Sequence, residues 1–412
     1  MKILIIGGGI GGLSAALALH RQGHEIEVRE QAREIRALGV GINLLPHAVG
    51  VLASYGLLPA LRAAGIEAQE YVFMNQFGQA ILSDARGRSA GYEHPQIAIH
   101  RGELQMILLR AAQAAIGADR VRTASRLADF QERDGQVHAR FAAPDGTSAG
   151  TVEADLMIGA DGIHSSVRAK FYPDEGPPKW NGVRLWRGTT VGAPFLSGAT
   201  IVKAGWTAQK FICYPIARLP DGQVLINWIA DLEQDATTLL DREDWNRPGR
   251  IEDFLPAYAD WRFPFLDLQR MVHDADGIYE FPMVDRDPVA RWSFGRITLL
   301  GDAAHPMYPI ASNGASQAIL DAETLATALT EAGDPVAALH RYESVRLPAT
   351  ARIIEMNRQQ GPDVVLDIVR ERAPQGFGRI DEVVPLAELQ AIVGRYKAAA
   401  GHRQLQAKDS HR

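Results

Sequence analysis

The sequence predicts an α/β protein in which a β-rich segment interrupts a domain of alternating strands and helices, with a helical region at the C-terminal end. Three observations carry this prediction. The chain opens with a strand, a glycine-rich turn, a helix and a second strand; two later apolar strands each run into a turn that contains aspartate; and a long central segment is rich in β-branched and aromatic residues.

The first unit lies at the N-terminus. Residues 3–29 show a short apolar strand, a run with Ala and Leu at helical spacing, and a second strand pattern. Between the first strand and the helix, Gly7, Gly9 and Gly12 have the GxGxxG spacing. The first glycine permits a tight turn, the second lets the backbone approach a pyrophosphate, and the third allows close packing of helix on strand. The unit therefore predicts a Rossmann-like dinucleotide-binding domain.

An acidic residue completes this motif. Glu30 follows the second strand directly, where a carboxylate accepts hydrogen bonds from a ribose diol. A glycine trio alone is a weak signal, but strands on both sides and a closing acid make it much stronger. We therefore expect an adenine dinucleotide, and this unit alone leaves NAD and FAD both open.

Two further stretches repeat the order strand, turn and helix. Residues 155–168, "DLMIGADGIHSSVR", lead from an apolar strand into Ala-Asp-Gly and a helix predicted to begin near Ser165. Residues 296–322 lead from a strand into Gly301 and Asp302 and a helix predicted to begin near Asn313. An aspartate at such a turn can bind a ribityl or ribose hydroxyl, and a helix N-terminus can face a pyrophosphate or a ring.

Composition and charge favour an enzyme that acts on a small molecule. The 412 residues are 46% hydrophobic and 22% charged, with a net charge of −6, so no global positive field favours nucleic acid or an anionic membrane. Cys213 is the only cysteine, which excludes an internal disulfide, and the chain starts without a charged leader region. A cytoplasmic protein is predicted.

Together the three stretches resemble the class A flavoprotein aromatic hydroxylases of the p-hydroxybenzoate hydroxylase type, from Met1 to about Arg352 and in the same order. The resemblance implies noncovalent FAD, O2, and NADH or NADPH as a transient co-substrate. It also implies hydroxylation of an aromatic ring through a flavin C4a-hydroperoxide. The presence of one GxGxxG motif fits a nicotinamide cofactor that binds and leaves.

The resemblance also assigns residues. The glycine turn and Glu30 would hold the ADP half of FAD, Asp161 would serve a site shared by FAD and NAD(P)H, and Asp302 would hold the ribityl chain. Residues 34–57 and 99–112 resemble two further FAD contacts. The predicted cofactor residues are Gly7, Gly9, Gly11, Gly12, Glu30, Arg36, Val40, Gly41, Ile42, Arg101, Asp161, Asp302, Asn313 and Gly314.

One segment departs from the family pattern. The family follows the Gly-Asp motif with Pro, two residues and Gly-Gln-Gly, whereas this chain has Pro309, two residues and then Ser312, Asn313 and Gly314. Asn313 keeps an amide and Gly314 keeps a flexible position, but Ser312 adds a side chain beside the expected flavin. The shape of the cavity over the ring is therefore expected to differ.

The same resemblance implies a division into domains. A discontinuous FAD-binding domain, a substrate-binding β-sheet domain, a C-terminal helical region and a disordered tail are predicted. The FAD-binding domain comprises residues 1–70, 100–177 and 286–338, and the substrate-binding domain comprises residues 71–99 and 178–285. The helical region comprises residues 339–400, and the tail comprises residues 401–412.

Short phrases such as "RALGVGIN", "FPMVDRDP" and "NGASQAILD" resemble the phenazine monooxygenase branch of the family, which forms pyocyanin. This likeness predicts an aromatic or fused heteroaromatic, phenazine-like substrate, with or without decarboxylation. Candidates beside the flavin are His305, Tyr308 and Pro309, although His305 has a structural hydrogen-bonding role as its alternative. Candidates for substrate binding are Arg184, Trp186, Arg187, Tyr214, Asn227 and Trp228, each of which also suits ordinary core or surface.

Alternatives remain open at this point. A decarboxylating hydroxylase of a single-ring acid, of the salicylate or hydroxynicotinate type, would need a small pocket with one placed cation. A flavin reductase or binding protein without hydroxylation belongs to another class. A plain NAD dehydrogenase leaves the Gly-Asp stretch unexplained. The expected partners are a small aromatic substrate and O2, without nucleic acid or stable membrane association, and the protein is expected to be a monomer or a homodimer.

Overall fold

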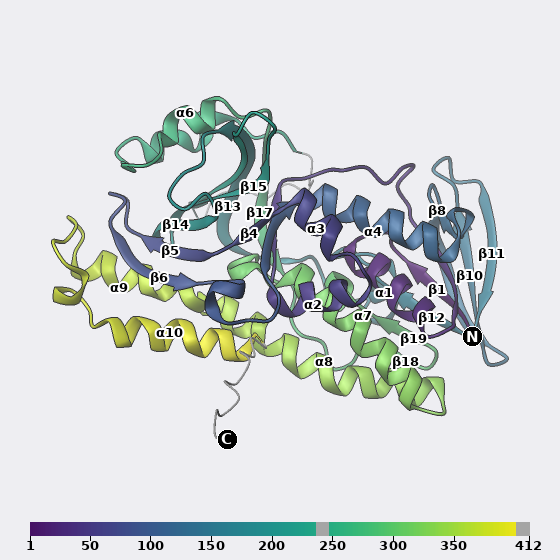
Figure 1. The fold of residues 1–412 in the computed structure, drawn as a ribbon. Coiled ribbons are helices and arrows are strands. Elements are labelled where there is room, and N and C mark those ends of the chain that lie inside the picture. The colour runs from purple at the N-terminus through teal and green to yellow at the C-terminus, as the bar shows by residue number, and fades with distance from the viewer. Residues whose placement is uncertain (236–246, 401–412) are drawn as a thin grey trace, which may run out of the picture.

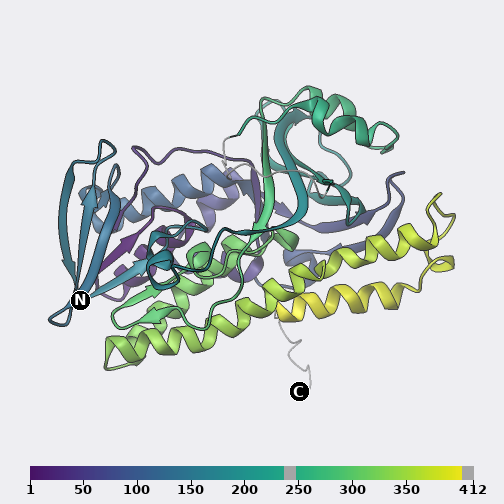
Figure 2. The same ribbon diagram turned by 180° about the vertical axis from the view of Figure 1, so that it is seen from behind.

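The protein is seen in a computed structural model, which describes residues 1–235 and 247–400 (Figure 1). The predicted disordered tail, residues 401–412, lies outside the described residues. Two β-rich bodies stand side by side and long C-terminal helices run beneath them (Figures 1 and 2). Within the described ranges, no helix combines the length and the apolar composition that crossing a membrane requires.

The predicted Rossmann-like unit forms the centre of a six-stranded sheet with the order β18-β19-β12-β1-β2-β8. Its strands pair in parallel except for β18 with β19. Its central strands β1, β2 and β12 are almost entirely buried. The strands β1 and β12 carry apolar residues on both faces because helices cover a parallel sheet on its two sides. The strands are β1 Lys2–Ile6, β2 Glu25–Arg29, β8 Val121–Arg122, β12 Leu156–Gly159, β18 Ser293–Phe294 and β19 Ile297–Leu299.

Helix α1 (Ile10–Arg21) packs against α4 (Arg101–Ile116) and α7 (Gly314–Glu331). The helix α5 (Ser166–Phe171) follows β12 and is capped by the Ser165 side chain, and α7 begins directly after Asn313. Both starts confirm the helix positions predicted from the two aspartate turns.

A three-stranded antiparallel sheet lies between β8 and β12 in the chain and forms one end of the molecule (Figure 1). It consists of β9 (Arg126–Arg133), β10 (Gln136–Ala142) and β11 (Ser148–Ala154). Apolar side chains from its inner face join the main core around β1 and α1. This sheet buttresses the parallel sheet.

The predicted β-rich segment forms a seven-stranded sheet with the order β17-β13-β16-β15-β14-β5-β6. All neighbours are antiparallel except β14 and β5. The helix α6 (Leu268–His273) lies over it at the edge of the molecule (Figure 1). The strands are β5 Glu70–Met74, β6 Ala80–Ala85, β13 Lys179–Gly192, β14 Thr200–Trp206, β15 Gln209–Arg218, β16 Val224–Glu233 and β17 Ile278–Asp285.

A small antiparallel sheet connects the two bodies. The strand β7 (Gln96–His100) pairs with both β3 (Gly41–Leu44) and β4 (Ile66–Ala68). The helices α2 (Pro46–Ser54) and α3 (Leu58–Ala64) lie between these strands in the chain. Because β3 also contacts β16, this sheet brings the segment after β2 against the seven-stranded sheet.

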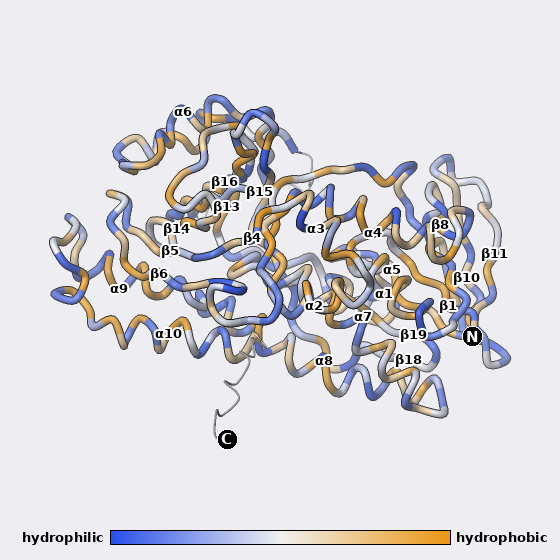
Figure 3. The backbone as a smooth tube through the Cα atoms, viewed as in Figure 1, coloured by the Kyte–Doolittle hydropathy of each residue, from blue (hydrophilic) through white to orange (hydrophobic). Residues whose placement is uncertain are grey.

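The C-terminal region is helical, as predicted. It consists of α8 (Pro335–Arg358), α9 (Val364–Arg372) and α10 (Leu386–Ala399). The helix α8 packs along α7, whereas α9 packs on β14 and β5 (Figure 2). Hydrophobic segments gather inside the molecule and the outer loops are mainly hydrophilic (Figure 3). The helices thus brace both bodies from one side.

Candidate functional site

A cavity of about 900 Å³ opens at the carboxyl ends of the parallel strands, and the seven-stranded sheet forms its opposite wall. Its lining comes from the turn after β1, the end of β2, β3, the start of α4, the turn after β12, strands β13 and β15 to β17, and the turn between β19 and α7. Ligands bind at this edge of open α/β sheets, and the volume suits a large ligand.

The glycine turn between β1 and α1 has room for a ligand at one position only. Gly7 has a φ of +110°, and a Cβ there would stand 2.3 Å from the Ala160 carbonyl oxygen. A Cβ on Gly12 would stand 2.0 Å from the Gly7 carbonyl oxygen. A Cβ on Gly9 would meet no protein atom within 4 Å, and Gly9 lines the cavity. The open space at Gly9, beside the uncapped start of α1, fits a pyrophosphate.

Glu30 stands beside this turn at the end of β2. Its carboxylate accepts hydrogen bonds from the backbone N–H groups of Gly8 and Ala32, each at 2.8 Å. These two bonds orient the carboxylate, and the residue lines the cavity. An acceptor fixed in this way is placed for a ribose diol.

Asp302 lies in the turn after β19 and is open to the cavity. The surrounding protein desolvates its carboxylate and raises its pKa, although the nearby charges of His305 and Arg101 oppose this rise. Arg101, the first residue of α4, also lines the cavity, and burial lowers the pKa of its guanidinium. Asp302 and Arg101 therefore present a carboxyl group and a guanidinium group to the same space.

The side chains of Asp161 and Arg168 form hydrogen bonds that fix the turns around the site. The Asp161 carboxylate accepts hydrogen bonds from the Ser165 hydroxyl at 2.5 Å and the Ser166 backbone N–H at 2.7 Å. The buried Arg168 donates to the Ala303 and Ala304 carbonyl oxygens at 3.1 and 2.8 Å. Arg168 thus joins the second motif to the turn that contains Asp302.

Two of the three flavin-cavity candidates do not line the cavity. His305 is buried behind the turn, with its Nε2 at 2.5 Å from Asp321, whose carboxylate also accepts from Arg346. Tyr308 is buried and hydrogen-bonded to Asp285, and burial raises its pKa to about 12. Pro309 does line the cavity. The geometry therefore favours the structural alternative for His305.

Among the substrate candidates, Arg187 and Tyr214 reach the cavity and interact with each other. Arg187 also donates to the Gly41 carbonyl oxygen at 2.6 Å, and burial lowers its pKa. Asn227 accepts from the Gly41 backbone N–H at 2.7 Å. Arg187 and Asn227 therefore hold β3 against the seven-stranded sheet, and Arg187 also faces the cavity.

The other substrate candidates point away from the cavity, because successive side chains on a strand face opposite sides of the sheet. Arg184 binds Glu280 at 3.0 Å, and Trp186 donates to the same carboxylate at 3.2 Å. Trp228 belongs to the hydrophobic core on that face. None of these three residues lines the cavity.

The predicted cofactor residues line the cavity with two exceptions. Gly12 lies under the turn, and Val40 is buried with its carbonyl oxygen bonded to the Arg101 backbone N–H at 2.8 Å. Asn313 and Gly314 line it, as does Ser312. The residues around the turn thus converge on one cavity.

Sequence reasoning missed the apolar wall of the cavity, which consists of Leu185, Ile229, Phe281 and Met283. Leu185 had a usable signal, since it stands two residues before Arg187 on one strand and shares its face. Ile229 had the same signal, since it stands two residues after Asn227 on β16. Phe281 and Met283 lie on β17, which pairs in this sheet with β13, a strand distant in sequence. They could not be found without the strand order.

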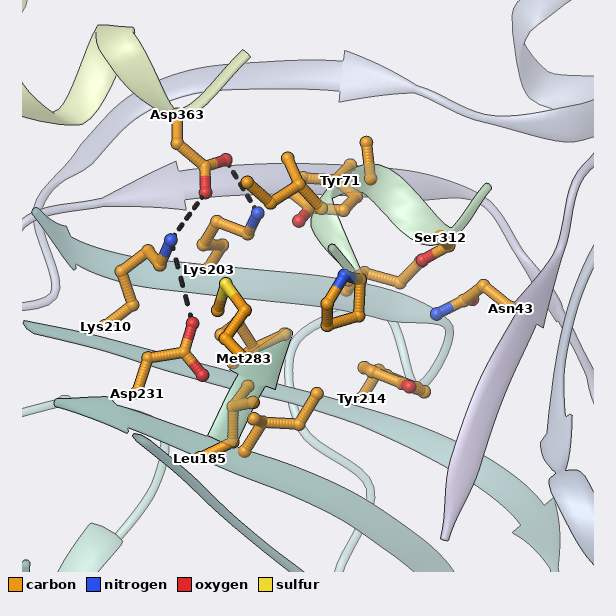
Figure 4. A pocket seen from close by; sticks show the side chains of 16 residues that line it. Asn43, Tyr71, Leu185, Lys203, Lys210, Tyr214, Asp231, Met283, Ser312 and Asp363 are labelled. Carbon is orange, nitrogen blue, oxygen red and sulfur yellow. Dashed lines mark hydrogen bonds and ion pairs between the residues drawn. The ribbon is translucent and has the colours of Figure 1, made fainter. Parts of the chain in front are cut away.

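A smaller inner chamber of about 50 Å³ adjoins the cavity (Figure 4). The two spaces share residues including Asn43, Leu185, Tyr214, Met283, Pro309 and Ser312. The far end of the chamber is polar, with Tyr71, Lys203, Lys210, Asp231 and Asp363.

The fold and the cavity are those of a dinucleotide-binding protein whose site lies at the edge of its Rossmann-like sheet. The chain belongs to the FAD-binding domain family, whose model matches residues 1–357. It is an FAD-dependent aromatic monooxygenase.

Known proteins are similar to this chain over most of its length. Phenazine 1,6-dicarboxylic acid hydroxylase PhzS of Lysobacter antibioticus is 42% identical over 410 residues, 98% of each chain. 3-Hydroxybenzoate 6-hydroxylase 1 of Aquipseudomonas alcaligenes is 30% identical over 368 residues, 87% of this chain and 88% of that one. Klebsiella pneumoniae HpxO, solved with FAD and uric acid, has a TM-score of 0.77 at 23% identity, covering 98% of this chain and 96% of that one. This last likeness supports the fold.

Proposed function

We propose that this chain hydroxylates a fused-ring aromatic acid of the phenazine type, using FAD, NAD(P)H and O2, with or without loss of CO2. The observation that carries the proposal is that the glycine turn and an apolar wall with a half-buried arginine, Arg187, line one cavity. The 42% identity to a phenazine dicarboxylic acid hydroxylase supports the same substrate class.

The proposed cofactor site uses the residues that line the cavity around the three motifs. Bound FAD supplies the redox chemistry and the activation of O2. Gly9 leaves open space where its pyrophosphate would lie, and Glu30 and Asp302 line the cavity where they would accept from the ribose and the ribityl chain. Gly12 and Val40 support the site through packing and a backbone hydrogen bond.

The proposed substrate site lies against the seven-stranded sheet. Leu185, Phe281 and Met283 offer an apolar wall on which a flat ring can pack, and Arg187 can bind a carboxylate. The wall also keeps water from the reacting ring, as this chemistry requires. Arg184, Trp186 and Trp228 are left out of the proposed site because they face the other side of the sheet.

His305 and Tyr308 are proposed as positioning residues rather than catalytic ones. His305 holds Asp321, which accepts a hydrogen bond from the Gly301 backbone N–H at 3.0 Å. Tyr308 is hydrogen-bonded to Asp285 at the end of β17. Asp285 stands two residues after Met283, which lines the cavity. Both residues act through the turn or strand that faces the cavity.

We also propose that the chain is divided into an FAD-binding domain, a substrate-binding domain and a C-terminal helical region with the residue ranges predicted from the sequence. The seven-stranded sheet supports it, since β5 and β6 join strands from residues 179–285. Monomer and homodimer are both proposed as oligomeric states, and size measurement by light scattering distinguishes them.

The direct test is a substrate screen with the holoenzyme. Phenazine-1-carboxylate and phenazine-1,6-dicarboxylate are compared with salicylate, 3-hydroxybenzoate and 6-hydroxynicotinate. The proposal expects the phenazine acids to accelerate NAD(P)H oxidation above the substrate-free rate and to yield a product with one added oxygen by mass spectrometry. Turnover of the single-ring acids without binding of either phenazine would replace it with the single-ring alternative. NAD(P)H oxidation without an oxygenated product would favour a reductase.

A further inference from the structure

Four buried charged side chains meet at the polar end of the inner chamber (Figure 4). Asp363 accepts from the Nζ atoms of Lys203 at 2.6 Å and Lys210 at 2.9 Å. Lys210 also lies 3.6 Å from an Asp231 carboxylate oxygen. Each of the four side chains is at most 6% exposed. We call these four residues the charged array.

The charged array has hydrogen-bonding capacity left over. An ammonium group has three donors, and Lys203 uses two of them on Asp363 and Tyr71, while Lys210 faces Asp363 and Asp231. The Oδ1 atom of Asp231 is buried without a hydrogen-bond partner in the described part of the chain. A buried polar atom left in this way is costly, so a polar group in the chamber would stabilise it.

The charge of the array also fits an anion. Burial raises the pKa of the Asp231 carboxyl, although Lys210 and Lys203 oppose this rise. When Asp231 holds a proton, two ammonium groups face one carboxylate, Asp363, and the array is positive. A neutral Asp231 can also donate the hydrogen bond that a carboxylate oxygen accepts.

The size of the inner chamber limits what can enter. Its volume of about 50 Å³ admits a group of a few heavy atoms, such as a carboxylate, but not an aromatic ring. The ring must therefore stay in the main cavity, against Leu185 and Met283, which line both spaces. Arg187 lines the main cavity and does not line the chamber, so the two basic positions belong to different spaces.

We propose that the charged array is the binding site for a second carboxylate, so that the preferred substrate is a fused-ring aromatic diacid. One carboxylate binds Arg187 and the other enters the inner chamber, where Lys203 and Lys210 donate to it beside Asp231. This inference rests on the proposed function and adds the subsite that distinguishes diacid from monoacid.

The test measures dissociation constants of phenazine-1,6-dicarboxylate and phenazine-1-carboxylate for the holoenzyme, by the change in flavin absorbance. Asp231→Asn puts an uncharged amide with a hydrogen-bond donor in place of a carboxyl that must take up a proton, so diacid binding should tighten several-fold while monoacid binding changes less than about twofold. Lys210→Met should weaken diacid binding about ten- to hundredfold, the effect of losing a hydrogen bond to a charged group, and leave the monoacid nearly unchanged. The gain expected for Asp231→Asn cannot arise from a folding defect.

Lys397→Met is the matched control, because Lys397 forms a partly buried ion pair with Asp84 at 2.6 Å and does not line either space. Equal effects of the array variants on both acids would show that the array only ties β14 and β15 to the loop before α9, and would overturn the inference. If the wild-type enzyme binds neither phenazine and turns over single-ring acids, the proposed function itself fails. The two failures are therefore distinguishable.

Discussion

Gly9 and Gly12 belong to the same turn and should respond differently to alanine, because a Cβ would meet protein atoms only at Gly12. Gly9→Ala places a methyl group in the open space of the cavity, so the free energy of unfolding of the apoprotein should stay near that of wild type. FAD affinity should fall by at least about tenfold, since the methyl group occupies the proposed pyrophosphate position. Fluorescence titration of apoprotein with FAD measures this.

Gly12→Ala is the matched control. Its Cβ would stand 2.0 Å from the Gly7 carbonyl oxygen, so the turn or α1 must shift and the apoprotein itself should lose stability. A Gly9→Ala protein that binds FAD as tightly as wild type would contradict the assignment of this turn to the pyrophosphate.

The carboxylate of Asp302 is predicted to hold a cofactor hydroxyl. Asp302→Ala should weaken FAD binding about ten- to hundredfold, because a hydrogen bond to a charged group contributes on the order of 1.5–3 kcal/mol. The measurement is the ratio of flavin to protein absorbance after gel filtration. Asp287→Ala serves as a control, since Asp287 pairs with Arg358 on α8 and does not line the cavity. Full FAD retention in the Asp302 variant would count against its role.

The ion pairs of Asp321 predict a pH dependence of stability. Burial alone would raise the pKa of Asp321, but the charges of His305 and Arg346 hold it at about 2, below its ordinary value. A carboxyl with a depressed folded pKa stabilises the fold above its unfolded pKa and loses that contribution as pH falls through the folded pKa. The difference in free energy of unfolding between wild type and Asp321→Asn should therefore shrink between about pH 4 and pH 2. Urea unfolding at several pH values tests this, and a difference independent of pH would refute it.

At the scale of elements, α10 fixes the loop between the aspartate turn and α7. Ala311 and Ser312 have φ values of +53° and +61°, a region that costs a side-chain-bearing residue roughly 1–3 kcal/mol. The Tyr396 hydroxyl on α10 accepts from the Asn313 amide at 2.9 Å and donates to Asn357 at 2.5 Å. These buried contacts hold the strained loop in place.

Tyr396→Phe should therefore loosen the loop without altering the lining of the cavity. We expect a loss of about 1–2 kcal/mol in stability and a larger fraction of NAD(P)H consumed without hydroxylated product. Product yield per NAD(P)H by chromatography measures the coupling. Tyr172→Phe is the control, because its hydroxyl bonds the Arg291 carbonyl oxygen at 2.8 Å near the surface. Coupling that is unchanged in Tyr396→Phe would show that α10 does not position this loop for catalysis.

At the scale of the whole molecule, the cavity lies between the six-stranded and the seven-stranded sheet, which have no strand in common. The six-stranded and seven-stranded sheets meet through the small β3-β7-β4 sheet, the helices and the contacts of Gly41 with Arg187 and Asn227. A ligand that fills the cavity touches both bodies at once. FAD is therefore expected to stabilise the whole fold.

Removal of FAD should lower the thermal midpoint, and readdition should restore it in a concentration-dependent way. A ligand at one hundred times its dissociation constant adds about 2.7 kcal/mol to the free energy of unfolding. Calorimetry of apoprotein over a range of FAD concentrations measures the shift. A midpoint independent of FAD would contradict a site that spans the two bodies.

The sequence by itself determined the features that depend on neighbouring residues. The strand, turn and helix of residues 2–21, the starts of α5 and α7 and the helical C-terminal region all follow from local spacing, caps and turn residues. Because the carboxyl ends of parallel strands meet at one edge, the motifs also predicted that Gly9, Glu30 and Asp302 would line one cavity.

Only the tertiary structure decided which side chains of the β-rich body face that cavity. Arg187 points into it and Trp186 points away, because adjacent residues on a strand face opposite sides and the register depends on partners far along the chain. Lys203 and Asp363 meet across 160 residues of sequence in a buried ion pair. Contacts of this kind have no local signal, since they arise when α9 and its preceding loop pack on the sheet.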